Sequence, residues 1–417
     1  MRAIYSLAWL PALPFAFLYL LWRSRLQPEY RRHWAERLGW APRLAGRPVL
    51  WIHAVSVGET RAAAPLLDAL RQRHPDHAIL LTHATPTGRA TGRELFGDAV
   101  HQAYLPYDFP LLTGLFLHRV QPSLGIVMET EIWPNLTAAC AKRGVPLFLV
   151  NARMSERSAR GYARFRALIR PALARLAGVA AQSEADARRL RDLGARAVRV
   201  TGNLKFDVAP AADHAARAAD LRARLAGRFV LLAASTREGE EALLLEALAG
   251  LDLPGLLLVL VPRHPQRFAE VARLIEAREL PYARRSTGNA VDAETRVLLG
   301  DSMGEMAAYY AAADLAYIGG SLVPLGGQNL IEAAALGCPA LIGPHTWNFA
   351  EASEQAVAAG AARRVADWTE LRAAVRALHD DKTTRQAMSA AGHAFAAANR
   401  GATRRTLELV ETALGAT

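Results

Sequence analysis

Short runs of apolar and β-branched residues alternate along this chain with longer stretches in which apolar residues recur at helical spacing. Such alternation is typical of a parallel sheet with helices on both faces. In the first half, the pattern predicts strands at residues 49–55, 78–82, 124–128, 147–151 and 179–182. In the second half, it predicts strands at residues 229–233, 256–261, 296–299, 315–318 and 339–342. We therefore predict an α/β protein with two doubly wound, Rossmann-like domains.

The same pattern places the boundaries between the parts of the chain. A length of 417 residues favours two domains, because a single core stops growing at about 250 to 300 residues. We predict an apolar anchor at 1–25, a first domain at 26–207, a second domain at 208–393 and a terminal segment at 394–417. Residues 208–228 are the predicted linker region, and residues 394–414 are predicted to form a helix that returns to the first domain.

The amino terminus is the most apolar part of the chain. Residues 4–22 form a run of 19 residues without a formal charge, between Arg2 and Arg23. That length barely spans a bilayer. Pro11 and Pro14 favour the alternative of a segment that lies in the membrane interface. No small-residue cleavage site follows, as a secretory signal would require. The basic residues after the run place the body of the protein in the cytoplasm.

The excess of positive charge is confined to the first half of the chain. Residues 1–207 contain 29 Lys and Arg against 15 Asp and Glu, whereas the rest contains 21 against 24. Such a surface favours anionic lipid or an acidic acceptor, and no nucleic-acid-binding motif accompanies it. Arginines interleaved with aromatic residues at 153–170 are either a solvated helix face or a surface for the phosphates of an amphiphile. The two cysteines, Cys140 and Cys338, exclude a disulfide scaffold and indicate a reducing compartment.

Ligands of open α/β sheets bind beyond the carboxyl ends of the strands, so the residues there are candidates for chemistry. Ser56 and Glu59 follow the first predicted strand and have the spacing of a capping box, which is a structural role. The alternative is that Glu59 removes a proton from an acceptor hydroxyl. The position at a strand end favours the second interpretation.

A second acidic group follows the strand at 124–128. Glu129 and Glu131 are one residue apart, and burying both carboxylates without partners would cost much free energy. The alternative is that they lie in a solvated turn. Lys205 lies in a loop with little other charge. If it points into a cleft, it can offset negative charge that develops on a leaving phosphate.

Arg263 follows a strand of the second domain and is a candidate phosphate ligand, because a guanidinium forks onto phosphate oxygens. Glycine pairs at 319–320 and 326–327 let the backbone approach a ligand closely. A helix predicted to open at Asn329 would aim free N–H groups at an anion.

Two acidic residues of the second domain have competing interpretations. Ser302 with Glu305, and Asn329 with Glu332, match capping-box spacing. Either carboxylate would equally serve to hold the hydroxyl groups of a ribose.

The chain contains no Asp-x-Asp pattern at a strand end and no His/Asp cluster at ligand spacing. We therefore expect neither a metal nor a cofactor, and we expect Arg, Lys and helix dipoles to neutralise the leaving group.

Taken together, these motifs resemble those of the 3-deoxy-D-manno-octulosonic acid (Kdo) transferases that act on lipid A precursors. The resemblance extends over nearly the whole chain. It rests on the runs SVGET at 56–60, ETEIWPN at 129–135, NARMS at 151–155, GNLKFD at 202–207, PRHP at 262–265 and GGQNLIE at 326–332.

The resemblance implies two Rossmann-like domains of the GT-B type that face a cleft, a CMP-Kdo donor and a metal-independent, inverting mechanism. It implies that Glu59 accepts the proton and that Glu129 and Lys205 stabilise the transition state. The first domain would bind lipid IVA, the lipid A precursor, at the cytoplasmic side of a bacterial inner membrane, and the second would bind CMP-Kdo. The implied nucleotide contacts are Pro262, Arg263, Met303, Gly304, Glu305, Asn329, Leu330, Ile331 and Glu332. Neither the number of Kdo residues added nor the oligomeric state follows from the sequence.

Three other functions are compatible with parts of this pattern. A GT-B transferase that moves a different nucleotide sugar, such as a UDP-sugar, onto a lipid acceptor would share the anchor. A nucleotide-sugar isomerase would need no anchor, and a membrane scaffold would need no carboxylate at position 59.

Overall fold

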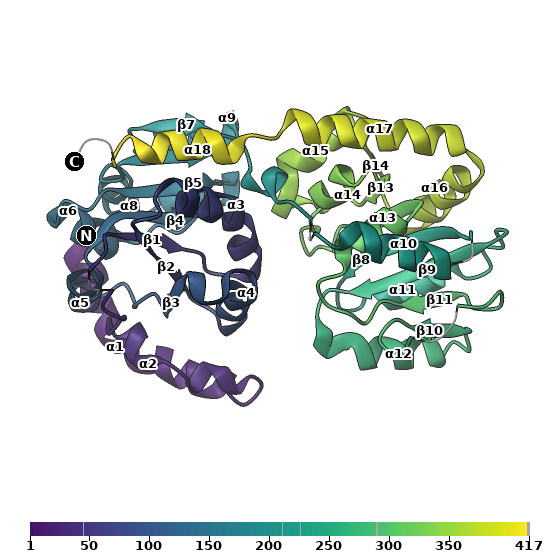
Figure 1. Ribbon diagram of the computed structural model, residues 1–417, viewed down its shortest axis with the longest axis horizontal. Coiled ribbons are helices and arrows are strands. Elements are labelled where there is room, and N and C mark those ends of the chain that lie inside the picture. The colour runs from purple at the N-terminus through teal and green to yellow at the C-terminus, as the bar shows by residue number, and fades with distance from the viewer. Residues whose placement is uncertain (45, 211, 226, 289–290, 415–417) are drawn as a thin grey trace. The chain divides into compact units, whose positions relative to one another are not determined.

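The computed structural model describes residues 1–414 apart from 45, 211, 226, 289 and 290. Contacts divide the chain into two compact units. Unit 1 comprises residues 1–208 and 400–417, and unit 2 comprises residues 209–399. Each unit is built around one seven-stranded parallel sheet with helices on both faces (Figure 1). The predicted α/β class with two Rossmann-like sheets is confirmed.

The sheet of unit 1 has the strand order β3-β2-β1-β4-β5-β6-β7. Its strands are β1 (Val49–His53), β2 (Ala78–His83), β3 (His101–Tyr104), β4 (Pro122–Met128), β5 (Leu147–Ala152), β6 (Gly178–Ala181) and β7 (Val198–Val200). Its helices are α1 (Arg2–Arg23), α2 (Trp34–Arg37), α3 (Val57–Arg73), α4 (Pro86–Phe96), α5 (Pro110–Val120), α6 (Pro134–Lys142), α7 (Glu156–Ala163), α8 (Arg166–Leu173), α9 (Glu184–Leu193) and α18 (Ala402–Glu411). Short 3-10 turns are η1 (Pro28–Arg31), η2 (Gly97–Ala99) and η3 (Leu204–Asp207).

The sheet of unit 2 has the order β10-β11-β9-β8-β12-β13-β14. Its strands are β8 (Phe229–Thr236), β9 (Leu256–Pro262), β10 (Tyr282–Arg284), β11 (Val297–Leu299), β12 (Leu315–Ile318), β13 (Ala340–Ile342) and β14 (Ala362–Arg364). Its helices are α10 (His214–Arg224), α11 (Glu240–Leu248), α12 (Phe268–Glu276), α13 (Met306–Ala312), α14 (Ile331–Ala335), α15 (Ala350–Ala358), α16 (Trp368–Asp380) and α17 (Lys382–Ala398), with 3-10 turns η4 (Pro265–Arg267) and η5 (Trp347–Phe349).

The pattern of apolar runs found the inner strands and missed the outer ones. All ten predicted strands are present, with ends shifted by at most three residues. The four strands that were not predicted, β3, β7, β10 and β14, are the four edge strands of the two sheets. Edge strands are short and partly solvated, so they carry polar residues and show no apolar run.

Each inner strand is buried on both faces because helices cover both sides of the sheet. In β1, Val49 and Trp51 belong to one apolar cluster, whereas Leu50 and Ile52 belong to the cluster on the other face. Both sheets reverse their strand order at the centre, between β1 and β4 in unit 1 and between β8 and β12 in unit 2. Such a reversal opens a crevice beyond the carboxyl ends of the strands.

Two predicted segments differ from the structure. The single helix expected at 394–414 is the end of α17 followed by α18, with Gly401 between them at φ +89°. The carboxylate of Asp207 accepts hydrogen bonds from the N–H groups of Gly401 and Thr403 at 2.7 and 2.6 Å, which holds the start of α18 on unit 1. The expected linker at 208–228 contains α10, whose contacts with α13 place it in unit 2.

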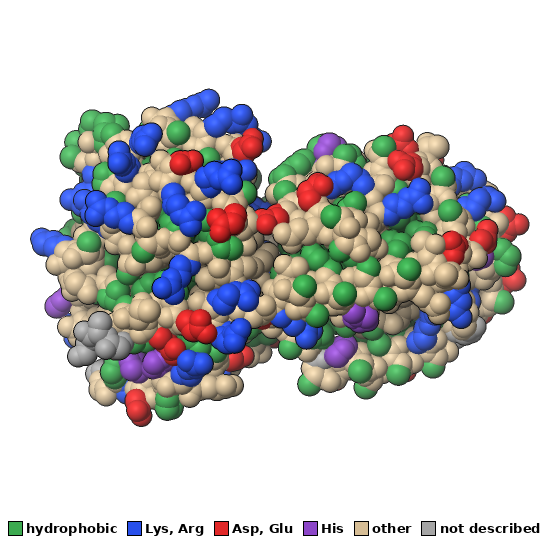
Figure 2. Space-filling model, turned by 90° about the horizontal axis from the view of Figure 1, so that it is seen from above, with side chains coloured by type: hydrophobic (Ala, Val, Ile, Leu, Met, Phe, Trp, Pro, Cys, Tyr) green, Lys and Arg blue, Asp and Glu red, His purple; other side chains and the backbone are tan. Residues whose placement is uncertain are grey.

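The charge of the first half is visible on the surface of unit 1. Figure 2 shows Lys and Arg side chains spread over the face of unit 1 that it draws, on the left. Cys140 and Cys338 are buried free thiols, in agreement with the absence of a disulfide scaffold.

Candidate active site

Glu59 lies in the first turn of α3, directly beyond β1. Ser56 is the N-cap residue, and its hydroxyl oxygen accepts a hydrogen bond from the Glu59 N–H at 3.4 Å. The Glu59 carboxylate accepts hydrogen bonds from the Val55 N–H at 2.9 Å and from the Ser56 hydroxyl at 3.1 Å. The Ser56 half of the predicted capping box is therefore present, whereas the carboxylate accepts from the N–H of Val55, one residue before the N-cap residue. Each carboxylate oxygen can still accept a further hydrogen bond, so this structural role leaves room for a second one.

The surroundings of Glu59 make its carboxyl group a weaker acid than that of an ordinary glutamate. Burial, together with the negative charges of Glu129 and Glu131, raises the pKa of Glu59 to about 7, against the hydrogen bonds from Val55 and Ser56 that lower it. A carboxyl group with a pKa near neutrality is present in both forms at neutral pH. That is the condition under which a general base works efficiently.

Glu129 and Lys205 form an ion pair next to Glu59. The Lys205 Nζ lies 3.1 Å from a Glu129 carboxylate oxygen, and both side chains are about four-fifths buried, at 19% and 20% exposure. Glu129 has φ +57°, a conformation that a residue with a side chain rarely adopts. Its N–H donates to the Val150 carbonyl at 2.8 Å, so the strained residue is fixed by the neighbouring strand. Strain of this kind concentrates at functional sites.

Asn151 is a residue whose role the motifs did not reveal. It is fully buried at the end of β5 with φ +53°, and its side-chain oxygen accepts a hydrogen bond from the Leu204 N–H at 3.0 Å. It thereby fixes the η3 turn that carries Lys205. A polar residue at the end of an otherwise apolar strand was the signal that could have pointed to it.

In unit 2, the end of β8 is irregular. The pairing of β8 with β9 shifts register between Ala234 and Thr236, and Ser235 has φ +56°. A Cβ atom on Gly319 would lie 2.5 Å from the Ser235 carbonyl oxygen, so glycine is required there. Bulges of this kind re-aim the residues that follow them.

Glu240 joins the loops after β8 and β12. Its side chain is fully buried and accepts hydrogen bonds from the Arg237 N–H at 2.9 Å, from the Gly320 N–H at 2.8 Å and from the Tyr317 hydroxyl. Burial raises the pKa of this carboxyl despite these donors. The sequence offered only one sign of this role, an acidic residue near the start of a helix.

The two glycine pairs close one loop. The Gly327 N–H donates to the Gly320 carbonyl at 2.8 Å, and the Gln328 N–H donates to the Gly319 carbonyl at 3.0 Å. A Cβ atom on Gly326, which has φ +89°, would lie 2.5 Å from atoms of Trp347 and Asn348. Loop closure therefore accounts for these glycines without a ligand.

The predicted helix start at Asn329 is wrong. The helix α14 begins at Ile331 and has only five residues, with Leu330 as its N-cap and no side-chain cap. Asn329 instead accepts a hydrogen bond from the Ile331 N–H at 3.1 Å. The capping box expected for Asn329 and Glu332 is absent, because the start of the helix lies further along the chain.

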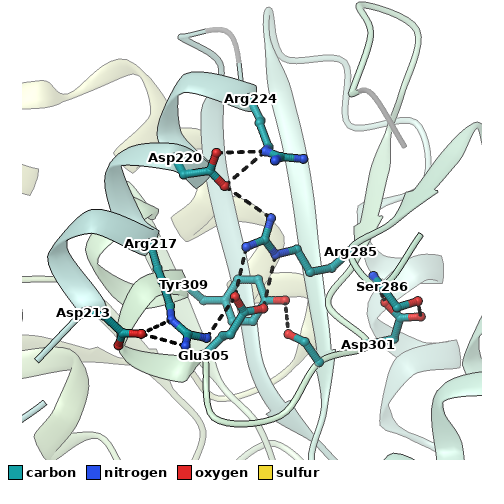
Figure 3. Close-up of polar contacts among 10 residues, drawn as sticks. Asp213, Arg217, Asp220, Arg224, Arg285, Ser286, Asp301, Glu305 and Tyr309 are labelled. Atoms are coloured by element: carbon teal, nitrogen blue, oxygen red, sulfur yellow. Dashed lines mark hydrogen bonds and ion pairs between the residues drawn. The ribbon is translucent and has the colours of Figure 1, made fainter. Parts of the chain in front are cut away.

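Glu305 lies in a network of ion pairs (Figure 3). Arg285 donates to its carboxylate at 2.9 and 3.2 Å, and Arg217 of α10 lies at 3.6 Å. The hydrogen bonds from Arg285 lower the pKa of Glu305, so it is charged. Glu305 is itself the N-cap residue of α13, which rules out the capping box expected with Ser302 as N-cap.

The other predicted nucleotide contacts lie at the end of β9 or in the segments after β9, β11 and β12. Leu330 is the N-cap residue of α14, and Ile331 and Glu332 lie in the first turn of that helix. Met303 is 58% exposed, and the adjacent Gly304 has φ +76°. Pro262 is buried at the end of β9, and the N–H of the half-buried Arg263 donates to the Thr236 carbonyl at 2.9 Å.

Within the described part of the chain, no three His, Cys, Asp or Glu side chains are grouped closely enough to hold a metal ion. His53 and His83 are fully buried, and burial lowers their pKa values to about 3 and about 4. Both are therefore neutral at physiological pH.

Three comparisons with known proteins bear on this arrangement. The sequence model of the family described as 3-deoxy-D-manno-octulosonic-acid transferase (kdotransferase) matches residues 32–208. A 3-deoxy-D-manno-octulosonic acid transferase from Bordetella pertussis is 48% identical over 99% of this chain and 100% of its own length. The enzyme of the same name from Haemophilus influenzae is 38% identical over 98% of each chain. A solved glycosyltransferase structure from Rickettsia africae has a TM-score of 0.61 at 13% identity, covering 89% of this chain and 100% of that one, and so shares the fold.

Proposed function

Since this chain belongs to the 3-deoxy-D-manno-octulosonic acid (Kdo) transferase family, we propose that it moves Kdo from CMP-Kdo onto lipid IVA, the lipid A precursor, with inversion at the anomeric carbon. The chain is a glycosyltransferase, as its motifs predicted. The observation that carries the mechanism is the Glu59 carboxyl, whose pKa lies at about 7 beside the ion pair of Glu129 and Lys205.

In this mechanism an acceptor hydroxyl attacks the anomeric carbon of Kdo from the face opposite CMP. The hydroxyl proton passes to the Glu59 carboxylate as the new carbon–oxygen bond forms. The bond between the anomeric carbon and the phosphate oxygen breaks, and CMP leaves with its electron pair. The Lys205 ammonium stabilises the negative charge of the transition state, and Glu129 holds that ammonium in place.

The donor is assigned to unit 2. We assign the CMP contacts to the end of β9, the loops after β9, β11 and β12, and the start of α14. The residues are Pro262, Arg263, Met303, Gly304, Glu305, Asn329, Leu330, Ile331 and Glu332. The Glu305 carboxylate forms ion pairs with Arg285 and Arg217. We therefore propose that Glu305 contributes to CMP binding by fixing the loop that carries Met303 and Gly304.

The function is tested by incubating the purified protein with CMP-Kdo and lipid IVA in EDTA, followed by mass spectrometry of the lipid. We expect addition of Kdo at an undiminished rate in EDTA, because arginine and lysine side chains neutralise the leaving group without a metal. UDP-sugars serve as the control donors. Transfer from a UDP-sugar but not from CMP-Kdo would reject the donor, and loss of activity in EDTA would reject the metal-independent mechanism.

We also propose that α1 attaches the protein to the cytoplasmic side of the inner membrane. It is long and apolar enough to cross a membrane by length and composition. One side packs on the rest of unit 1, where the Phe17 ring contacts the rings of Trp34 and Tyr107 with centroids 5.1 and 5.8 Å apart. The other side exposes large apolar side chains, which water disfavours and a bilayer accepts. They include Ile4, Leu7, Leu10, Phe15, Leu18 and Trp22.

Charge on this exposed side of α1 is expected to release the protein from membranes. The double variant Leu7→Glu, Leu18→Glu should lower co-sedimentation with anionic vesicles by at least about tenfold, because each buried leucine contributes about 1.5 to 3 kcal/mol. The matched control is Leu243→Glu, an exposed leucine of α11, which should bind vesicles like the wild type. Unchanged sedimentation of the double variant would show that α1 is not the attachment site.

A further inference from the structure

Two arginines stand side by side where β8 and β9 end. Thr236 pairs with Pro262 in the parallel ladder, and the Arg263 N–H donates to the Thr236 carbonyl at 2.9 Å. Arg237 and Arg263 are therefore the next residues on neighbouring strands, which in any sheet lie about 4.8 Å apart. Both side chains are half-buried. The positive charges of both arginines act on His264, so both lie near it, and an anion between two such charges would offset their repulsion.

The backbone at Arg237 is fixed against the glycine loop. Glu240 accepts hydrogen bonds from the N–H groups of both Arg237 and Gly320, so one buried carboxylate holds the two segments together. A Cβ atom on Gly320 would lie 3.4 Å from the Arg237 Cγ and 3.5 Å from the Gln328 Nε2. The stem of Arg237 therefore passes close over the Gly320 backbone, which limits where the guanidinium can lie.

The guanidinium of Arg237 has no acidic partner among the residues that the structure describes. The nearby Arg267, by contrast, is occupied by the buried Glu241, with contacts of 2.6 and 2.9 Å. His264 adds no charge, since burial and the surrounding arginines lower its pKa. A half-buried arginine without a carboxylate partner is the side chain expected to receive an anionic ligand.

We propose that Arg237 binds the carboxylate of the Kdo donor, while the neighbouring Arg263 binds its phosphate. The proposal rests on the proposed function. In CMP-Kdo the anomeric carbon carries both the carboxylate and the phosphate oxygen, so the donor presents two anionic groups a few bonds apart. Two arginines on neighbouring strands match that spacing, and each guanidinium can fork onto its oxygens. A nucleotide carrying a neutral sugar would leave Arg237 without a ligand, so Arg237 selects for a sugar acid.

The test compares two ligands on the full-length protein in detergent with EDTA. Glu59→Gln is the background and no lipid acceptor is added, so that no transfer occurs. Titration calorimetry measures CMP and CMP-Kdo. Adding Arg237→Gln should lower the affinity for CMP-Kdo by about 10- to 100-fold, which is the loss expected for one charged, hydrogen-bonded contact. The affinity for CMP should fall by less than about threefold. Arg237→Lys keeps the charge but cannot donate two parallel hydrogen bonds, so its affinity for CMP-Kdo should lie between those of the two proteins. The matched control is Arg296→Gln, an exposed arginine just before β11 at the opposite edge of the sheet.

Two results would overturn the proposal. An equal loss of affinity for CMP and CMP-Kdo would assign Arg237 to the phosphate, and unchanged affinity for both would remove it from the donor site. These results are distinct from a failure of the proposed function, in which the wild-type protein would transfer no Kdo from CMP-Kdo to lipid IVA.

Discussion

The variant Glu59→Gln is expected to lose about three orders of magnitude in Kdo transfer, within the range of about 10²- to 10⁴-fold that a general base contributes. The amide cannot accept a proton, so the attacking hydroxyl must lose its proton to water. Turnover should fall while CMP affinity stays the same, because Glu59 lies in unit 1 and the nucleotide contacts are assigned to unit 2. Steady-state kinetics and CMP titration measure the two effects separately.

The stability of the same variant shows whether it still folds. The side-chain oxygen of glutamine can still accept the hydrogen bond from the Val55 N–H, and Ser56 still caps the helix, so α3 keeps its start. The folded pKa of Glu59 is raised, so this group favours folding at low pH and loses that contribution as the pH rises through about 7. Glu59→Gln should therefore unfold in urea at least as late as the wild type at pH 8. An early unfolding transition would mean that lost activity reports lost structure.

The pH profile gives a second readout on the same carboxyl. In the wild type, kcat/KM should rise as the pH passes about 7 and then level off, because only the deprotonated base is active. The residual activity of Glu59→Gln should lack this step. A step of the same size at the same pH in both proteins would exclude Glu59 as the base.

The variant Lys205→Met is expected to lower kcat for transfer by about 10²- to 10³-fold, the cost of removing one preorganised group that stabilises transition-state charge. It also leaves Glu129 without the ammonium 3.1 Å away. The loss should appear in kcat more than in KM, because the charge develops only in the transition state. Stopped assays over a range of CMP-Kdo concentrations separate the two parameters.

Two further variants show whether this effect depends on position. Lys205→Arg keeps the charge and should retain more activity than Lys205→Met. Lys142→Met removes an exposed lysine at the end of α6 and should behave like the wild type. If Lys205→Met raised KM alone, Lys205 would serve in binding and the proposed role in the transition state would be wrong.

The candidate site was partly predictable because its residues follow strands. The spacing of Ser56 and Glu59 predicts the Ser56 cap from local sequence alone, and the structure contains that cap, although the Glu59 carboxylate bonds to the Val55 N–H. The same reasoning failed at Asn329, since the loop after β12 runs two residues further before the helix begins. The position of a helix cap depends on where the preceding loop ends. Here the hydrogen bonds of the loop to Gly319 and Gly320 determine where it ends, and local sequence does not show them.

The sequence by itself determined the two-sheet α/β architecture, because burial of an inner strand on both faces requires an unbroken apolar run. It also determined the family, because the motifs carry it. Only the tertiary structure brought Glu129 next to Lys205, 76 residues away, and placed Arg237 beside Arg263. It alone decided the pKa of Glu59, which sums burial and charges from separate elements. The physical reason is that strand patterns arise from neighbours along the chain, whereas electrostatics and pairing arise from neighbours in space.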